Sequence, residues 1–381
     1  MTAAPGRSSL GESLRATAPA WLASRAIVLV AYLVASQAID RGWIHRATAK
    51  GRVQQGLLGW DAGWYRAVAT RGYGSLGRES TRFFPLWPEL VRSLHLLGVP
   101  VTWALVGGAS LLWWAALVAV DQLGVSLGMD ARRRTTTIWL LCLVPGAVAT
   151  VFAYSEPLLV LLVAVVLALL YRTKGRTAGS PATWLLIAAL GIAIGLTRPV
   201  GVLVAAPVAV EAWRRRGRGL TLATQVLAAV GPLVGIGGYL LWVRHQFGDA
   251  LLPLRVQTEA GHHGALTNPI SGLVHGFEMA AQGHLSAVMH LPWVALALVA
   301  LVAGARKVPW SATLYGGLVV GLALAGQNLD SFERYLLAAP TLFFVAAGWL
   351  GRRWLRVSAL LALAAGLLGT SVLVFADCLV P

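Results

Sequence analysis

Apolar stretches of helical length recur along almost the whole chain. They fall at residues 21–39, 101–120, 136–153, 157–171, 182–197, 200–213, 220–243, 287–303, 311–326, 335–350 and 357–376. A helix of about 20 apolar residues crosses a hydrocarbon core about 30 Å thick, so these stretches predict about 10–11 transmembrane helices. Only 12% of the residues are charged, against about 25% in soluble proteins. We therefore expect an all-α polytopic integral membrane protein in which residues 1–381 form a single domain.

The region between residues 182 and 213 is too long for one membrane-spanning helix. Its roughly 32 residues would reach about 48 Å as a single helix, well beyond the hydrocarbon core. We expect a break at Arg198-Pro199. The stretches 157–171 and 200–213 are shorter than a perpendicular span requires, so we expect them to be tilted, broken or only partly inserted.

The charges are distributed unevenly along the chain. The 31 Lys and Arg residues outnumber the 15 Asp and Glu residues and give a net charge of +16. Such an excess is typical of nucleic-acid binding or of the loop charges that orient a membrane protein. With segment 1–20 in the cytoplasm, more than half of the basic residues lie on the inner side, against only Glu12, Asp121, Asp130 and Glu211 among the acids. Because this follows the positive-inside rule, we expect a multi-pass plasma-membrane protein with a cytoplasmic N-terminus and no nucleic-acid partner.

Two long segments, 40–100 and 244–286, are predicted to lie on the extracytoplasmic side. They are rich in His, Trp and charge, whereas the inner loops are short and contain no glycine-rich phosphate-binding motif. Cys142 and Cys378 have no spacing typical of a disulfide framework or a metal site. We therefore expect any chemistry on the outer side, and no cofactor.

One carboxylate of the first outer segment stands among aromatic residues, in Trp60-Asp61-Ala62-Gly63-Trp64-Tyr65. At a membrane surface these neighbours would partly desolvate Asp61, which raises the affinity of a carboxylate for a proton and suits it to act as a general base. The alternative is an aromatic belt at the membrane interface with an Asp that caps a helix. The residues alone leave both interpretations open.

Charged residues also occur at the ends of predicted spans, where ionisable groups are costly. Glu156 follows Tyr154-Ser155 at one outer junction, and Arg198 lies at the next one. These two residues could form a structural ion pair or line a polar substrate pocket. Arg334 and Tyr335 stand at the start of the stretch 335–350, where an ordinary solvated helix start is the rival interpretation.

The second outer segment adds further polar candidates. Asp249 follows Phe247-Gly248 at a predicted helix exit and would be available to a ligand. His262 and His263 are the densest part of a scattered group of histidines, none of which has the H-E-x-x-H spacing of a zinc helix. We therefore predict no metal site.

The order of these motifs resembles that of the PIG-V type mannosyltransferases, the family of GPI mannosyltransferase II and its bacterial relatives, within the GT-C class of membrane glycosyltransferases. The motifs are W-D-A-G-W-Y at 60–65, F-F-P-L-W-P at 83–88, Y-S-E-P at 154–157, T-R-P-V-G at 197–201, F-G-D at 247–249 and R-Y at 334–335. W-D followed by F-F-P is specific, whereas R-Y alone is a weak signal. The resemblance implies a GT-C-like helical bundle with a large first extracytoplasmic loop.

The resemblance also implies a reaction, the transfer of a mannosyl residue from a polyprenyl-phosphate-linked donor to an acceptor hydroxyl on the extracytoplasmic face. Asp61 matches the acidic residue that GT-C enzymes use as the base. Many of those enzymes have a second acid in the same loop, whereas Ala62 follows Asp61 here and leaves no obvious second carboxylate for a metal. The substrate-binding candidates are then Trp60, Trp64, Tyr65, Tyr154, Glu156, Asp249 and Tyr335.

Elementary chemistry assigns roles to the charged residues. A phosphate leaving group is already a stable anion and needs no proton from an acid, unlike the alkoxide released in glycoside hydrolysis. One base and compensating cations therefore suffice for a single displacement with inversion. We expect Asp61 to accept the proton of the acceptor hydroxyl and Arg198 and Arg334 to bind the donor phosphate.

Two other functions stay open at this point. A lipid or sugar transporter would have as many spans, although transporters usually bind near the midplane, and here the unusual residues gather at one face. A non-catalytic glycan-assembly factor would tolerate changes of Asp61 and Arg198. The expected partners are a polyprenyl-phosphate sugar donor, membrane lipids, and an envelope glycan, lipid or protein acceptor, among which the residues do not discriminate.

Overall fold

The computed structural model describes residues 9–172, 179–259, 267–326, 329 and 331–380, and the regular elements in these ranges are all helices. The side chains of Leu33 and Leu233, on two of the longest helices, are each 53% exposed, which gives these helices apolar outer faces suited to lipid. Five helices are long and apolar enough to cross a membrane: α1 (Leu10–Asp40), α5 (Val101–Ser126), α10 (Leu220–Phe247), α13 (Leu285–Gly304) and α17 (Arg353–Phe375). The prediction of an all-α polytopic membrane protein is confirmed.

The remaining apolar stretches fold as shorter helices, and three of them fold in two pieces. Proline lacks a backbone N–H and fixes φ, so it ends or interrupts a helix. The expected break at Arg198-Pro199 is confirmed, because α8 ends at Gly195 and the next helix begins at Pro199. The whole helices are α7 (Glu156–Arg172), α8 (Pro181–Gly195) and α14 (Trp310–Leu324), and the divided ones are α6 (Ala131–Leu143) with η4 (Pro145–Thr150), η5 (Pro199–Val204) with α9 (Ala205–Arg214), and α15 (Phe332–Leu336) with α16 (Pro340–Trp349).

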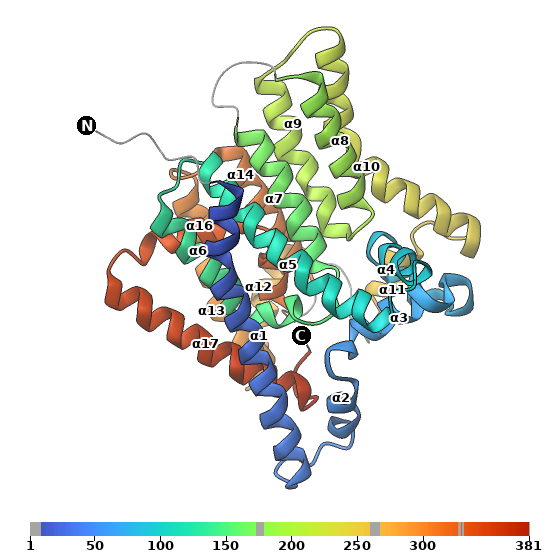
Figure 1. Ribbon diagram of the computed structural model, residues 1–381, viewed down its shortest axis with the longest axis vertical. Helices are drawn as coiled ribbons and strands as arrows, with labels where there is room; N and C mark the ends of the chain where they lie inside the picture. The colour runs from blue at the N-terminus through green and yellow to red at the C-terminus, as the bar shows by residue number, and fades with distance from the viewer. Residues whose placement is uncertain (1–8, 173–178, 260–266, 327–328, 330, 381) are drawn as a thin grey trace.

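The helices alternate in direction, so the molecule has two chemically different ends. We call the end at which α1, α10 and α17 finish the α3 end, after the helix α3 (Asp61–Arg71) that lies there. Helix α3 packs against α4 (Leu86–Leu96) there, as Figure 1 shows. The basic clusters 132–134, 214–216 and 352–353 stand at the opposite end, where α6 and α17 begin and α9 ends. All the breaks between paired helix pieces occur towards the α3 end.

Segment 40–100, predicted as a long outer loop, is built from short helices rather than irregular chain. Its aromatic side chains Tyr73, Phe84 and Trp87 are buried and tie these helices to α5 and α10. The helices of the segment are α2 (Ala49–Gln55), η1 (Gly56–Leu58), α3, η2 (Tyr73–Ser75), η3 (Arg78–Arg82) and α4 (Leu86–Leu96). This packing gives the residues around Asp61 a rigid support.

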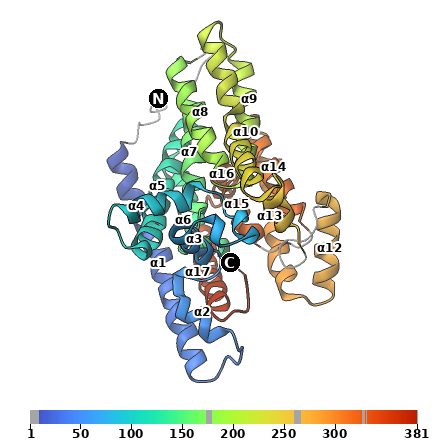
Figure 2. The same cartoon turned by 90° about the vertical axis from the view of Figure 1, so that its right-hand side faces the viewer.

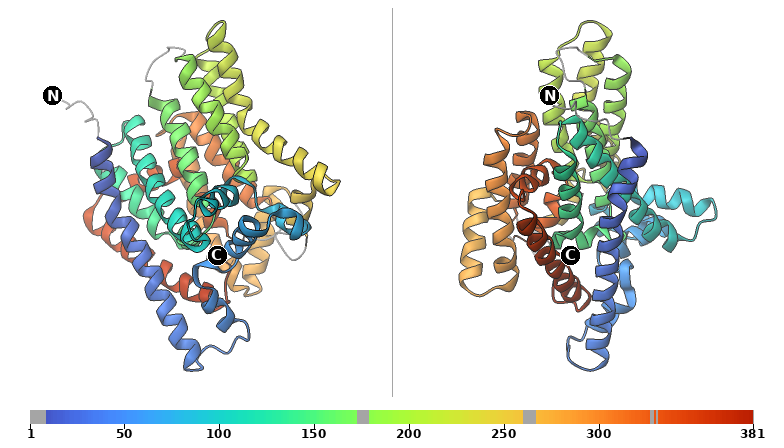
Figure 3. Two further views of the ribbon diagram at one scale, coloured as in Figure 1. Left: turned by 45° about the vertical axis from the view of Figure 1, so that its right-hand side comes forward. Right: turned by 60° about the vertical axis from the view of Figure 1, so that its left-hand side comes forward.

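Segment 244–286 is likewise mostly helical in its described part. Helix α10 ends at Phe247, and Gly248 closes it with φ of 80°, the left-handed conformation typical of glycine at a helix end. The helices α11 (Leu252–Gln257) and α12 (Pro269–Ala281) follow, and α12 stands with α13 beside the main bundle (Figures 2 and 3). His262 and His263 lie outside the described residues.

The first helix starts earlier than the apolar pattern predicts. Segment 1–20 was expected as a polar N-terminal stretch, but α1 already begins at Leu10. The side chain of Ser9 accepts a hydrogen bond from the backbone of Glu12 and the Glu12 carboxylate accepts one from the backbone of Ser9, which forms a capping box. The polar residues of this first part are used internally, because Ser13 donates to Asp121 of α5 at 2.6 Å.

Helices α8 and α10 approach each other closely through glycines spaced four residues apart. A Cβ atom added at Gly195 of α8 would lie 2.2 Å from the carbonyl oxygen of Pro232, and one added at Gly235 of α10 would lie 2.1 Å from that of Ile192. Small residues at this spacing allow two backbones to touch in a membrane. The contact fixes the end of α8, from which Arg198 follows.

Candidate active site

Asp61 is the first residue of α3, and it does not act as the cap of that helix. The cap position is taken by Trp60, whose backbone has φ of 56°, a conformation that is uncommon for any residue other than glycine. One carboxylate oxygen of Asp61, Oδ2, accepts a hydrogen bond from Nη2 of Arg334 at 2.8 Å. About a third of the Asp61 side chain is exposed (34%). Asp61 is therefore both paired with a cation and accessible.

Glu156, at the start of α7, binds both candidate arginines. Its Oε1 atom accepts hydrogen bonds from Nη1 of Arg198 and from Nε of Arg334. The Glu156 side chain is 4% exposed, and its Oε2 atom has no hydrogen-bond partner among the described residues. Breaking such a buried pair is costly, whereas an unused acceptor can still receive a hydroxyl donor. Glu156 and Arg198 therefore form an ion pair, and Glu156 keeps a free acceptor atom that could also line a polar site.

The four charged residues form one continuous cluster, which we call the Asp61–Arg198 cluster: Asp61, Arg334, Glu156 and Arg198 in order of contact. Two carboxylates balance two guanidinium groups within it. The members come from the start of α3, the start of α7, the break after α8 and the short helix α15. The fold thus brings together four residues that lie far apart in the sequence.

Arg334 is held in place from several sides. Its guanidinium lies over the ring of Tyr154, with 4.5 Å between the charged carbon and the ring centroid, which is within the range of a cation–π contact. The backbone of η4 packs tightly beneath it, because a Cβ atom added at Gly146 would lie 2.8 Å from the Arg334 backbone nitrogen. The Arg334 side chain is only 8% exposed. Arg334 is therefore not the solvated residue of an ordinary helix start.

A small cavity adjoins the cluster. Its volume is about 10 Å³, roughly the minimum that accommodates one water molecule. Glu156, Arg198, Arg334 and Tyr335 line it together with apolar residues of α7, of η5 and of the turn after α15. Tyr335, a substrate-binding candidate, thus lies beside both arginines, and the space between them is nearly closed.

The charge of Asp61 differs from the expectation. Burial acts to raise the pKa of Asp61, but the guanidinium of Arg334, followed by those of Arg198 and Arg82, outweighs it and holds the pKa of the carboxyl below its ordinary value. The expected increase in proton affinity is therefore wrong for this arrangement of side chains. The residues around Asp61 in the sequence did not indicate the lower pKa, because its main cause, Arg334, is far away in the chain.

The aromatic candidates divide into accessible and inaccessible residues. Tyr65 is 3% exposed and Tyr154 is 1% exposed, so neither ring is open to a sugar in this structure. The Tyr65 hydroxyl instead makes a 2.6 Å hydrogen bond with Ser155, and burial raises the pKa of Tyr65 to about 12. Tyr65, expected among the substrate-binding residues, therefore presents no open ring face in this structure. Trp60 and Trp64 are partly exposed and line an open groove beside α3.

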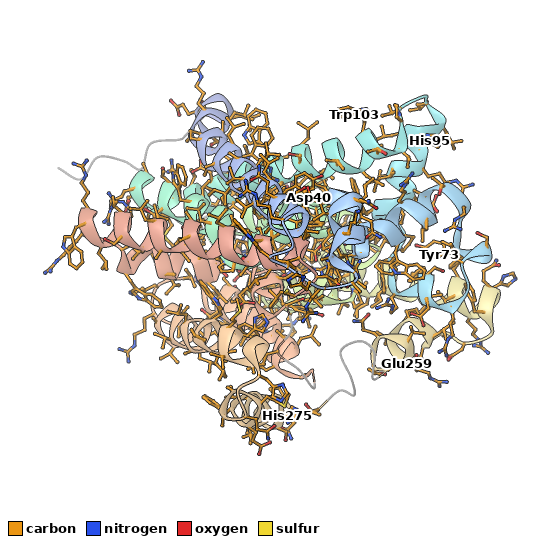
Figure 4. The ribbon with its side chains drawn as sticks, turned by 90° about the horizontal axis from the view of Figure 1, so that it is seen from below. Asp40, Tyr73, His95, Trp103, Glu259 and His275 are labelled. Atoms are coloured by element: carbon orange, nitrogen blue, oxygen red, sulfur yellow. The ribbon has the colours of Figure 1, made fainter. Side chains whose placement is uncertain are left out.

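Asp249 has local partners away from the cluster. It accepts a hydrogen bond from the backbone of Leu251 at 2.9 Å and pairs with Arg255 at 3.0 Å. The helix exit predicted at Phe247-Gly248 is confirmed, but nothing in the described structure connects Asp249 to Asp61. Within the described ranges, no three His, Cys, Asp or Glu residues are placed to hold a metal ion. Figure 4 accordingly shows His95 and His275 on opposite sides of the molecule.

Two features of the site region had no signal in the sequence. Asp377, just after α17, accepts a hydrogen bond from Nε of Arg52 at 2.8 Å. The Arg52 guanidinium lies 3.8 Å from the centroid of the Trp60 ring. His290 of α13 makes a 2.6 Å contact with Glu333, the neighbour of Arg334. Both pairs join segments far apart in the chain, and neither belongs to a recognisable motif.

The fold and the cluster define an all-helical polytopic membrane protein with a charge-balanced, largely buried polar site at one end. No protein-family model matches the chain, and no curated protein matches it either. Among solved structures it is similar to the oligosaccharyltransferase of Archaeoglobus fulgidus.

Three structures of that enzyme were compared with the chain. The complex with Zn and sulfate gives a TM-score of 0.41 at 14% identity, covering 78% of this chain and 44% of that one. The form tethered to an acceptor peptide with the NVT sequon gives 0.45 at 12% identity, covering 93% and 55%. The complex with an inhibitory peptide and a dolichol-phosphate gives 0.44 at 13% identity, again covering 93% and 55%. The chain thus spans about half the length of these relatives.

Proposed function

We propose that the protein is a membrane glycosyltransferase that moves a mannosyl residue from a polyprenyl-phosphate-linked donor to an acceptor hydroxyl on the extracytoplasmic face of the plasma membrane. The observation that carries the proposal is the Asp61–Arg198 cluster. It combines a partly exposed carboxylate with one buried and one half-buried guanidinium group at one end of a bundle suited to a lipid bilayer. The order of the sequence motifs supports the same class of enzyme.

The proposed reaction is a single displacement. The acceptor oxygen forms a bond to the anomeric carbon of the donor sugar while the bond from that carbon to the phosphate oxygen breaks. The polyprenyl phosphate leaves with the bonding electron pair, and the proton of the acceptor hydroxyl passes to Asp61. Inversion at the anomeric carbon follows from the single displacement.

The two arginines balance the charge that develops on the leaving phosphate. In the ligand-free cluster their charges are satisfied by Asp61 and Glu156. A phosphate that binds Arg334 would draw it from Asp61, and the pKa of Asp61 would then rise because burial is no longer opposed. Donor binding would thus strengthen the base at the moment it is needed. The unpartnered Oε2 of Glu156 is positioned to accept a hydrogen bond from a sugar hydroxyl.

The direct test uses membranes that contain the protein and radiolabelled polyprenyl-phosphate mannose, with ion gradients abolished by ionophores. The proposal predicts that label passes to an acceptor and that free polyprenyl phosphate accumulates. A transporter would move the donor without cleaving it. A non-catalytic assembly factor would give no transfer of its own, and Asp61 and Arg198 variants would then leave any background transfer unchanged.

A further inference from the structure

A groove of about 680 Å³ runs along the surface of α2, η1, α3 and η2. Gly63 and Ala67 are two of its lining residues on α3, and their small side chains leave the middle of the helix face open. The other lining side chains include Arg52, Gln55, Trp60, Trp64, Arg66 and Arg71. A volume of this size is that of a ligand site rather than of a packing defect.

The groove has an excess of positive charge. Three arginines line it, and no Asp or Glu residue does. Arg52 is neutralised by Asp377, but Arg66 and Arg71 are exposed and make no ion pair with any residue that the structure describes. Guanidinium groups bind phosphate and carboxylate in a two-pronged geometry. The groove is therefore suited to an anionic ligand.

The groove also has two tryptophans in fixed positions. Trp64 stacks on Phe83 with 5.6 Å between ring centroids and 13° between ring planes. The Arg52 guanidinium packs against the Trp60 ring, and the ion pair of Arg52 with Asp377 fixes the position of that guanidinium. The strained backbone of Trp60, with φ of 56°, persists only where its surroundings determine it, and such residues cluster at functional sites. Flat indole surfaces that cost no reordering suit the apolar face of a sugar ring.

The groove and the charged cluster meet at one point in the chain. Trp60 lines the groove, while its neighbour Asp61 turns towards Arg334. Residues 60, 63, 64, 67 and 71 follow one face of α3 at helical spacing, so a ligand lying along this face would have one end beside Asp61. The groove and the base therefore share the start of α3, where a lining residue and Asp61 are consecutive in the chain.

We propose that this groove is the acceptor subsite and that it takes a sugar unit bearing a phosphate group. The inference rests on the proposed function, because it makes the hydroxyl of that sugar the one that Asp61 deprotonates. The tryptophans hold the ring, and Arg66 and Arg71 hold the phosphate. A soluble phosphorylated glycan and the headgroup of a glycosylated phospholipid share this chemistry.

The test measures equilibrium binding to the purified full-length protein in lipid nanodiscs, without donor. The soluble probes are mannose 6-phosphate and unphosphorylated mannose, and the lipid probes are vesicles of phosphatidylcholine with and without phosphatidylinositol. The variant is Arg66→Gln with Arg71→Gln. The matched control is Arg41→Gln with Arg244→Gln. These two arginines are exposed and lie outside the groove, so their replacement removes the same amount of positive charge.

The proposal predicts that the phosphorylated sugar, or the vesicles with phosphatidylinositol, bind more tightly than their neutral counterparts. The groove variant should weaken this binding about tenfold or more, and the control should retain it. Whichever phosphorylated probe binds identifies the source of the acceptor. Two results would overturn the proposal. One is equal binding of mannose 6-phosphate and mannose together with equal binding of vesicles with and without phosphatidylinositol, and the other is an unchanged affinity in the groove variant.

The failure of this inference is distinguishable from failure of the proposed function. Asp61→Asn should keep the binding of the phosphorylated probe, because its side chain does not line the groove. Loss of sugar transfer in that variant together with intact probe binding supports both proposals. Intact probe binding in a protein that never cleaves a prenyl-phosphate sugar would reject glycosyl transfer and leave the binding site standing.

Discussion

At the scale of single residues, the decisive contact is the one between Asp61 and Arg334. Burial alone would raise the pKa of Asp61, and the guanidinium groups reverse the sign of the shift. The carboxylate is therefore ionised at neutral pH and takes up a proton only at a pH below the ordinary range for Asp. The proposed base is available throughout the physiological range, and its strength depends on where Arg334 makes its bonds.

Replacement of Arg334 should reveal this dependence. In Arg334→Gln the largest opposing charge is gone, so burial should raise the pKa of Asp61. The acidic limb of the rate against pH, measured at limiting donor so that it reports the donor-free enzyme, should move to higher pH, and the rate itself should fall. An acidic limb that stays in place or moves to lower pH would show that Asp61 does not titrate with the rate. Arg244→Gln serves as the control of equal charge and should leave the profile unchanged.

Glu156 and Asp249 should respond very differently to loss of charge. Glu156→Gln removes the buried counter-ion that Arg334 and the half-buried Arg198 share, which typically costs roughly 3–5 kcal/mol of stability. Asp249→Asn interrupts a pair with Arg255, whose side chain is 69% exposed, and such a pair is worth about 0–1 kcal/mol. Thermal unfolding in detergent should show a marked drop for the first variant and little change for the second. Near-normal transfer by Asp249→Asn would agree with its position away from the cluster, and a strong loss would contradict it.

At the scale of helices, the close contact of α8 and α10 determines where Arg198 emerges. Gly235→Ala would place a Cβ atom 2.1 Å from the carbonyl oxygen of Ile192, so the helices must separate. We expect lower thermal stability and lower transfer, since Arg198 moves with the end of α8. Gly237→Ala, two residues further along the same helix, meets nothing within 4 Å and should be neutral or slightly stabilising. Equal behaviour of the two variants would show that the contact does not position the site.

The apolar pattern was sufficient to locate the long apolar helices, because transmembrane segments are selected by length and hydropathy. It did not predict the short helices of segment 40–100, whose composition is more polar. It also predicted the break at Arg198-Pro199, since proline acts locally. It could not predict that Glu156 binds two arginines at once, because that contact requires α7, α8 and α15 to pack together. The direction of the pKa shift of Asp61 was mispredicted, and the burial of Tyr65 was not predicted, because partners distant in sequence determine both.

At the scale of the whole molecule, the account requires the α3 end to face away from the cytoplasm. Ser75→Cys places a thiol at an exposed position of the groove, and Arg218→Cys places one at an exposed position of the opposite end. In a background with Cys378→Ser, a membrane-impermeant maleimide added to intact cells should label the first thiol and not the second. Permeabilised cells should show both. The reverse pattern would place the cluster on the cytoplasmic side and reject the proposed orientation.

The central claim is that Asp61 is the base of a glycosyl transfer, and Asp61→Asn tests it most directly. The amide keeps the shape of the side chain but cannot accept the proton. With polyprenyl-phosphate mannose as donor, binding of the donor should be retained while the rate of sugar transfer falls about 10²–10⁴-fold. Near-normal transfer by Asp61→Asn, at normal donor binding, would contradict the account.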